Sequence, residues 1–287
     1  MPTLVAATPA GDVPLGPALS IFDPVHIGID EFGHPVRVPM IFRNMLIAGE
    51  PGSGKSGLVN GVVGHAALSL DCTLCLIDAK EVELGQWEDC ADVFVGPDIT
   101  HALATLRRVQ TVLNNRNAYL KACRPRRRKT MTKDVFKPIV LAIDEFAYFS
   151  ATVGSKAQRE EFSMLLRDLV ARGRAVGVIV VAATQRPSSD IIPTSLRDLF
   201  AWRFAGRCTT NSSSDIILGH GWAQQGWSAN TISPTNPGAG LLIAEGGSPQ
   251  LVKVAYLDDT TCAAIAAYAT TLRATVRQTK PGLAVAS

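Results

Sequence analysis

The sequence predicts an α/β fold in which helices flank a mostly parallel central sheet. Strand-sized apolar runs alternate with helical segments along most of the chain, the order typical of strand–helix–strand units. The run at residues 178–183 is apolar throughout, as expected of a strand buried on both faces. Hydrophobic residues make up 47% of the 287 residues and charged residues 18%, which permits a sizeable core and excludes a disordered chain.

The individual elements follow in a regular order after a loose start. Residues 1–35 are rich in Pro, Gly and Ala and are expected to form a lead-in, with a short hairpin at 27–30 and 35–38. One domain is expected over residues 36–275, followed by a tail over 276–287. Strands are expected at 45–48, 73–77, 139–143, 178–183, 202–205, 240–244 and 251–256, and helices at 58–70, 99–121, 157–171 and 258–273. The Gly/Ser/Asn/Pro-rich stretch 219–240 is predicted to be a long loop.

Membrane, secretion and metal signals are weak in this sequence. No apolar run approaches the ~20 residues that cross a bilayer, and the N-terminus lacks the pattern of a signal peptide. We therefore expect a cytoplasmic protein without a transmembrane segment of its own. Of the six cysteines, Cys72 and Cys75 form a C-x-x-C, but no second pair lies at zinc-finger spacing. Buried, reduced thiols are the favoured interpretation.

The net charge is only +3, but one segment of the chain is strongly basic. Between His101 and Lys137 there are eleven Lys or Arg residues and a single acidic residue, Asp134. A solvated helix followed by a basic loop explains this pattern, and so does a contact with a polyanion. Composition alone leaves both interpretations open.

A phosphate-binding loop follows the first expected core strand. Residues 49–56 match G-x-x-x-x-G-K-[ST] in full, with a strand before them and a helix after them. Glycines allow backbone N–H groups to turn inward around phosphate oxygens, and the helix presents its positive end to them. Lys55 is expected to reach the β- and γ-phosphates of ATP, and the Ser56 hydroxyl to bind Mg²⁺. The predicted nucleotide-binding residues are Gly49, Glu50, Pro51, Gly52, Ser53, Gly54, Lys55, Ser56 and Gly57.

An acidic pair ends the buried strand at 139–143. Asp144 is expected to hold Mg²⁺, and Glu145 to orient and deprotonate the attacking water. The alternative is a pair of acids at a helix N-terminus. Gln185, at the end of the next strand, is the candidate sensor of the water and the γ-phosphate, unless it is a surface residue in a turn.

These motifs together resemble the motor domain of the FtsK/SpoIIIE family over roughly residues 40–260. The resemblance rests on the phosphate-binding loop, on Asp78-Ala79-Lys80, on residues 141–147, and on the block from Arg172-Gly173-Arg174 to Thr184-Gln185-Arg186-Pro187-Ser188. Within the family, the sequence of these motifs is most similar to that of actinobacterial conjugation translocases of the TraB kind.

The resemblance implies a RecA-like P-loop NTPase that works as a hexameric ring and moves double-stranded DNA by hydrolysing ATP. It also implies an arginine finger that completes the ATP site of the neighbouring subunit. Arg174 occupies that position, Arg172 competes with it, and an ordinary surface charge is the alternative. The sequence departs from full-length relatives because it has no membrane-spanning N-terminal region and little room for a C-terminal winged-helix domain. Two arrangements are therefore open: a compact stand-alone motor, or a motor that borrows an anchor from a membrane-anchored partner, which recruits it to the inner face of the membrane.

Two other classes of P-loop protein compete with this interpretation. Protein-export ATPases of the type VII kind share the motor domain, although they usually carry several copies in tandem. The segment from Arg107 to Lys137 favours a polyanionic substrate over a protein one. A P-loop kinase or signalling switch fits poorly with Asp144, Glu145 and Gln185.

Overall fold

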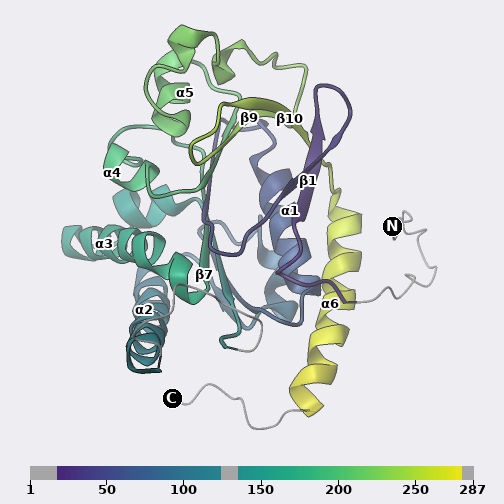
Figure 1. The fold of residues 1–287 in the computed structure, drawn as a ribbon, viewed down its shortest axis with the longest axis vertical. Helices are drawn as coiled ribbons and strands as arrows, with labels where there is room; N and C mark the ends of the chain where they lie inside the picture. The colour runs from purple at the N-terminus through teal and green to yellow at the C-terminus, as the bar shows by residue number, and fades with distance from the viewer. Residues whose placement is uncertain (1–17, 124–134, 280–287) are drawn as a thin grey trace.

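A ten-stranded sheet with helices on both faces forms the body of the molecule (Figure 1). The computed structural model describes residues 18–123 and 135–279. The strand order is β2-β1-β10-β9-β8-β3-β7-β6-β4-β5. The strands are β1 (Val25–Asp30), β2 (Pro35–Val38), β3 (Met45–Ala48), β4 (Thr73–Asp78), β5 (Val93–Val95), β6 (Ile139–Asp144), β7 (Val178–Thr184), β8 (Trp202–Gly206), β9 (Ala239–Ala244) and β10 (Gln250–Val254). The helices are α1 (Lys55–Leu68), α2 (Ile99–Cys123), α3 (Lys156–Gly173), α4 (Thr194–Arg197), α5 (Asn211–Leu218) and α6 (Asp259–Thr279).

The sheet has a parallel part and an antiparallel part. Strands β8, β3, β7, β6, β4 and β5 run parallel to their neighbours, while β9, β10, β1 and β2 join antiparallel to each other and to β8. The carboxyl ends of the parallel strands therefore meet at one edge, which is where ligands bind in sheets of this kind. Because β10 is antiparallel to β9 and β9 to β8, the carboxyl end of β10 also lies at this edge.

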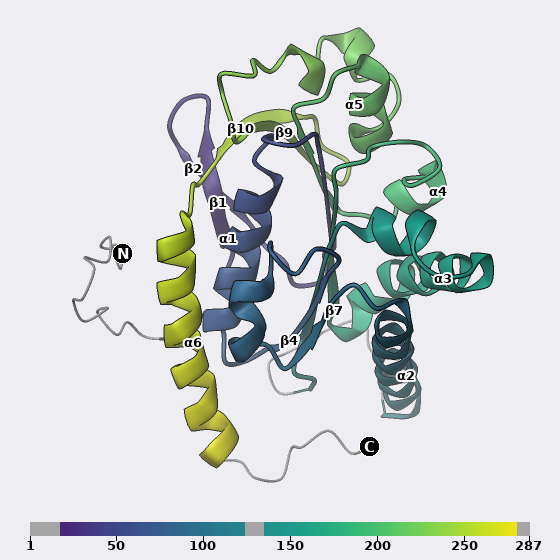
Figure 2. The same cartoon turned by 180° about the vertical axis from the view of Figure 1, so that it is seen from behind.

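Alternate side chains of each core strand enter two separate hydrophobic clusters. Helices α1 and α6 cover one face of the sheet, and α2 and α3 cover the other, as Figures 1 and 2 show. On β3, Leu46 packs on the α2–α3 side, whereas Met45 and Ile47 pack on the α1–α6 side. This two-sided burial explains why the core strands read as continuous apolar runs. The predicted fold class, α/β with a mostly parallel sheet flanked by helices, is confirmed.

The structure differs from the sequence-based expectation at several short elements. The three-residue β5, the one-turn α4 and the helix α5 were not expected, and 3₁₀ turns at Ala223–Gln225 and Ala229–Thr231 interrupt the predicted long loop. Helix α6 continues to Thr279, beyond the expected end at residue 273. The hairpin expected in the lead-in forms, and its strand β1 pairs with β10, so the sheet begins within that segment.

Helix α6 is fastened to α1 by a buried arginine. Arg273 donates hydrogen bonds to the carbonyl oxygens of Ala66 and Ala67, at 2.9 and 2.8 Å, and forms an ion pair with Asp92 at 2.8 Å. Those two carbonyls lie in the last turn of α1, where a cation complements the helix dipole. The contact therefore stabilises the C-terminal end of the helix that begins at Lys55.

The thiols of the C-x-x-C are buried, as predicted. Burial raises the pKa of Cys72 and that of Cys75 to about 12. Among the described residues, no group of His, Cys, Asp or Glu side chains has the arrangement of a metal site. In the same part of the chain, none of the helices combines the length and apolar character needed to cross a membrane.

Candidate nucleotide-binding and hydrolysis site

The predicted phosphate-binding loop connects β3 to α1 at the carboxyl edge of the sheet. Gly52 and Gly54 have φ angles of 77° and 90°, in the left-handed region that favours glycine. A Cβ at Gly54 would lie 2.4 Å from the Cα of Gly238, so a side chain there has no room. The Ser53 hydroxyl is buried without a hydrogen-bond partner among the described residues. The loop thus has the backbone conformation of a phosphate cradle and a free donor within it.

Glu50 braces this loop from outside. Its carboxylate accepts a hydrogen bond from the backbone N–H of Thr209 at 2.7 Å and lies 3.2 Å from the guanidinium of Arg207. The backbone N–H of Glu50 donates to the carbonyl of Arg207 at 3.0 Å. The side chain of Glu50, a predicted nucleotide-binding residue, therefore holds the loop against the end of β8.

Lys55 and Asp144 form an ion pair at the centre of the site. Both side chains are almost fully buried, with 3% and 1% exposed. Burial raises the pKa of Asp144, while the charge and hydrogen bond of Lys55 oppose that shift. The second carboxylate oxygen of Asp144 is buried and has no hydrogen-bond partner in the described part of the chain. An orphaned carboxylate oxygen near the first turn of α1, where Ser56 lies, fits a divalent cation held by Asp144 and Ser56.

Glu145 is held in a fixed orientation by the adjacent strand. Its φ angle of 49° is uncommon for a residue other than glycine, and such backbones concentrate at functional sites. The hydroxyl of Thr184 donates to one carboxylate oxygen at 2.6 Å, and the backbone N–H of Gln185 donates to the other at 2.9 Å. The ammonium of Lys80 lies 4.0 Å away. These contacts present an acceptor carboxylate next to Asp144, as a general base for water requires.

Thr184 is a member of this site that was not predicted from the sequence. The predicted residue was its neighbour Gln185, whose backbone N–H contacts Glu145, and a sensor role for the Gln185 side chain stays a prediction. The signal for Thr184 was a hydroxyl at the end of an otherwise apolar strand, and Thr184 is fully buried there. A buried hydroxyl needs a partner, so its position beside the end of β6 predicts the contact.

We expect Thr184→Val to lower kcat for ATP hydrolysis by about 10- to 100-fold with little change in KM. Valine keeps the shape but removes the donor to Glu145 and the acceptor for the backbone N–H of Arg186. Thr184→Ser keeps the hydroxyl and should recover most of the rate. Steady-state kinetics of the three proteins measure the effect. Equal loss in the serine and valine variants would show that packing, and not the hydroxyl, matters.

The two candidate finger arginines lie at the opposite end of β7 from Glu145. Arg174 donates to the carbonyl of Phe42 at 2.8 Å and forms an ion pair with Glu245 at 2.7 Å. Arg172 is paired with Asp168 on its own helix. At roughly 3.3 Å per residue, the length of β7 separates Arg174 from Thr184 by about 20 Å. Neither arginine can therefore reach the nucleotide site of its own chain.

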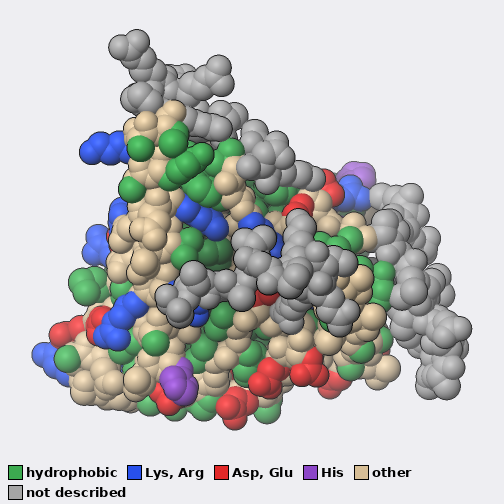
Figure 3. Space-filling view, turned by 90° about the horizontal axis from the view of Figure 1, so that it is seen from below, with side chains coloured by type: hydrophobic (Ala, Val, Ile, Leu, Met, Phe, Trp, Pro, Cys, Tyr) green, Lys and Arg blue, Asp and Glu red, His purple; other side chains and the backbone are tan. Residues whose placement is uncertain are grey.

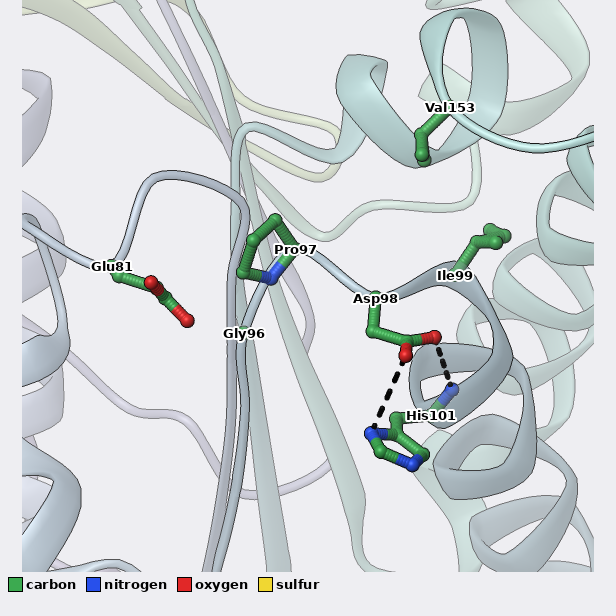
Figure 4. Close-up of a pocket in the computed structure, with 7 residues that line it drawn as sticks. All are labelled: Glu81, Gly96, Pro97, Asp98, Ile99, His101 and Val153. Atoms are coloured by element: carbon green, nitrogen blue, oxygen red, sulfur yellow. Dashed lines mark hydrogen bonds and ion pairs between the residues drawn. The ribbon is translucent and has the colours of Figure 1, made fainter.

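A shallow pocket lies beyond the carboxyl ends of β4 and β5. Figure 4 shows its lining, with Glu81 on one side and Asp98 and His101 on the other. Asp98 accepts hydrogen bonds from the backbone N–H groups of Thr100 and His101, and these bonds lower its pKa. Asp98 thus serves as the N-terminal cap of α2. The pocket contains none of the predicted nucleotide-binding residues.

Two arginines in the described part of the basic segment make structural contacts. Arg107 forms a bidentate ion pair with Glu161, at 2.7 Å for both bonds, and Arg116 donates to the carbonyls of Val176 and Lys137. The arginine cluster at 124–129 lies outside the described residues. Seen from below, the described surface carries Lys and Arg side chains on one part and a row of acidic side chains along one rim (Figure 3). The two interpretations of the basic segment therefore both stand.

Comparisons with known proteins agree with the motif assignment. Residues 12–137 match the FtsK/SpoIIIE family. The DNA translocase FtsK of Treponema pallidum is 34% identical over 212 residues, which cover 68% of this chain and 26% of that protein. The DNA translocase FtsK of Staphylococcus aureus is 27% identical over 221 residues, covering 70% and 27%. The chain thus spans about a quarter of the length of these relatives.

Solved structures with the same fold include a conjugation coupling protein and the ATPases of EssC. The pCW3 conjugation coupling protein TcpA, in a monomer form with ATPγS, superposes with a TM-score of 0.73 at 21% identity, covering 88% of this chain and 71% of that one. EssC (ATPases 2 and 3) of Geobacillus thermodenitrificans superposes with a TM-score of 0.70 at 14% identity, covering 93% and 53%. At these identities the similarity establishes the fold alone.

Proposed function

Because this chain is a P-loop ATPase of the FtsK/SpoIIIE family, we propose that it couples ATP hydrolysis to the movement of double-stranded DNA. The observation that supports hydrolysis most directly is Glu145, held by Thr184 and Gln185 beside the Lys55–Asp144 pair. Many small-molecule kinases do not need to activate water, because an acceptor hydroxyl takes its place. Support for DNA comes from the translocase relatives and from the basic segment.

In this proposal, each residue of the site has a defined role in ATP binding or hydrolysis. The loop amides and Lys55 bind the phosphates, and Lys55 must leave Asp144 in part to do so. Asp144 and Ser56 would hold Mg²⁺, which would neutralise phosphate charge when bound. Glu145 orients the water and accepts its proton, while the contacts from Thr184 and Gln185 keep the carboxylate from rotating away.

The decisive experiment measures ATP turnover with three added polymers. We expect double-stranded DNA to raise the rate, and single-stranded DNA and a basic or acidic peptide to leave it near the basal value. Stimulation by peptide without stimulation by duplex would instead favour the protein-export function of the type VII kind. Basal turnover in this assay tests ATP hydrolysis, and the change in rate when a polymer is added tests the substrate, so the two conclusions are tested separately.

The basic segment gives a second prediction about DNA. Replacing Arg126, Arg127 and Arg128 with alanine is expected to weaken duplex binding and to reduce the slope of log affinity against log salt by roughly 0.9 for each phosphate that is no longer neutralised. Backbone contacts with little sequence preference suit a motor that moves along any sequence. A salt titration of wild type and variant measures the slope. An unchanged slope would identify these arginines as a solvated face.

We also propose that the active form is a hexameric ring in which Arg174 completes the site of the neighbouring subunit. Mixing Arg174→Ala with Lys55→Ala subunits is then expected to restore part of the turnover, because a Lys55→Ala subunit still donates Arg174 to an intact neighbour. Arg172→Ala, which disturbs the pair with Asp168 and the hydrogen bond to Asn114, is the matched control and should retain activity. Failure to restore turnover in rings shown to be mixed would refute the assignment.

The proposal extends to the cellular setting. We propose that the protein acts in the cytoplasm in plasmid or chromosomal DNA transfer, as a relative of TraB-like conjugation translocases. A membrane-anchored partner would then recruit it to the inner face of the membrane. Co-fractionation with membranes in the presence and absence of other transfer proteins tests this arrangement.

A further inference from the structure

The strand order determines on which side of β3 the base of a bound nucleotide would lie. The phosphate-binding loop follows β3, and the acids Asp144 and Glu145 follow β6, two strands away on one side. Glu145 must face the γ-phosphate, because the water that it activates attacks there. The sugar and base must therefore extend away from β6, across the first turn of α1, toward the side where β8, β9 and β10 lie.

The segment after β10 lies directly against that first turn. A Cβ built on Gly57 would be 3.5 Å from the carbonyl oxygen of Ala255 and 3.6 Å from a methyl group of Val254. The next residue along the chain is Tyr256, which is 86% exposed, the largest value among the exposed large apolar side chains of the described residues. In Figures 1 and 2 this segment passes beside the start of α1 on its way to α6.

The backbone around Tyr256 is fixed although its side chain is exposed. The N–H of Val254 donates to the carbonyl of Gly238 at 2.8 Å, and that of Ala255 donates to the carbonyl of Ile27 at 2.9 Å. On the other side, Asp258 caps α6 through the N–H of Thr261 at 2.7 Å. An aromatic ring on a backbone anchored at both sides is preorganised to bind a flat ligand at little further entropic cost.

We propose that Tyr256 forms the platform on which the base of the bound nucleotide stacks. This inference rests on the proposed ATPase function and adds the residue that recognises the base. A stacked base covers the ring face that is open to solvent and contributes a contact that the phosphates do not supply. Since every base has a π-face, this contact favours nucleotides over inorganic polyphosphate without selecting strongly among bases.

The experiment compares calorimetric binding of MgATP and of magnesium tripolyphosphate to the full chain. For Tyr256→Ala, the affinity for ATP is expected to fall roughly 10- to 100-fold, while the affinity for tripolyphosphate stays within about twofold. Tyr256→Phe keeps the ring and should keep the wild-type affinities. Tyr119→Ala, which removes an exposed tyrosine from α2 on the opposite face of the sheet, is the matched control and should change neither.

Each other outcome has a defined meaning. Unchanged ATP affinity in Tyr256→Ala would overturn the inference, as would an equal loss of ATP and tripolyphosphate binding, which would point to a disturbed phosphate-binding loop. Failure of the wild type to bind ATP at all would overturn the proposed function and this inference together. Normal ATP binding by the wild type with no effect at Tyr256 would overturn the inference alone.

Discussion

Glu145→Gln is expected to lower kcat for ATP hydrolysis by about 10²- to 10⁴-fold while ATP binding is retained. Glutamine has the shape of glutamate, so its carbonyl can accept from the N–H of Gln185 and its amide can donate to the hydroxyl of Thr184. It cannot accept a proton from water. The substitution therefore removes the proton acceptor and keeps the hydrogen bonds that surround it.

The measurement pairs steady-state turnover with calorimetric ATP binding for wild type and variant. Glu81→Gln is the matched control, because Glu81 is also a glutamate with a positive φ but lines the shallow pocket after β4. The control should hydrolyse ATP normally. Turnover near the wild-type rate in Glu145→Gln would place the base on another residue, and loss of ATP binding would mean that the substitution disturbs the whole site.

Lys55→Ala is expected to abolish measurable ATP turnover in a protein that still folds. Lys55 is the buried cation of the site, and its loss removes the contact to the β- and γ-phosphates along with transition-state charge stabilisation. Turnover, ATP binding and near-ultraviolet circular dichroism should be measured on one preparation. Normal turnover with native dichroism would contradict the entire assignment of the site.

The same substitution is expected to lower the free energy of unfolding by about 3–5 kcal/mol at neutral pH, because it leaves Asp144 buried without its partner. Burial already raises the pKa of Asp144 above its ordinary value, and removing Lys55 removes the group that opposes this shift. A group with a raised folded-state pKa contributes stability at low pH and loses it as pH rises through that pKa. The difference between variant and wild type should therefore shrink as pH is lowered.

Denaturant unfolding at several pH values tests this behaviour. Adding Asp144→Asn to Lys55→Ala removes the buried charge and should restore part of the stability at neutral pH without restoring turnover. A pH-independent difference in the single variant would show that the loss comes from packing around the lysine stem.

The core strands and the phosphate-binding loop could be predicted because local sequence determines them. Strand β7 is apolar at every position but its last, and the glycines of the loop have the positive φ that their spacing implied. Helix α5 escaped prediction because Asn211–Ser214 are poor helix formers, and the helix depends on its cap at Thr210 and on packing of Ile217 and Leu218.

The contact between Thr184 and Glu145 could not be predicted from the sequence, for a different reason. Both residues could be placed at the ends of buried strands from the sequence, but the side chain that points into the site depends on the local backbone. The left-handed conformation of Glu145 turns its carboxylate toward β7, where it meets the hydroxyl of Thr184 and the N–H of Gln185. No propensity predicts a positive φ for glutamate, because tertiary contacts impose it.

The guanidinium of Arg273 joins the C-terminal helix to the helix that carries the phosphate-binding lysine. Helix α1 carries its positive end at the phosphate-binding loop and its negative end at the carbonyl groups of Ala66 and Ala67. Arg273 donates hydrogen bonds to those two carbonyl groups, one helix length away from the loop. Shortening the chain before this residue would leave those carbonyl groups without their cation and remove the hydrogen bonds that anchor the end of α1. A truncation far from the loop would then loosen the helix on which Lys55 and Ser56 lie, although every residue of the cradle remained in place.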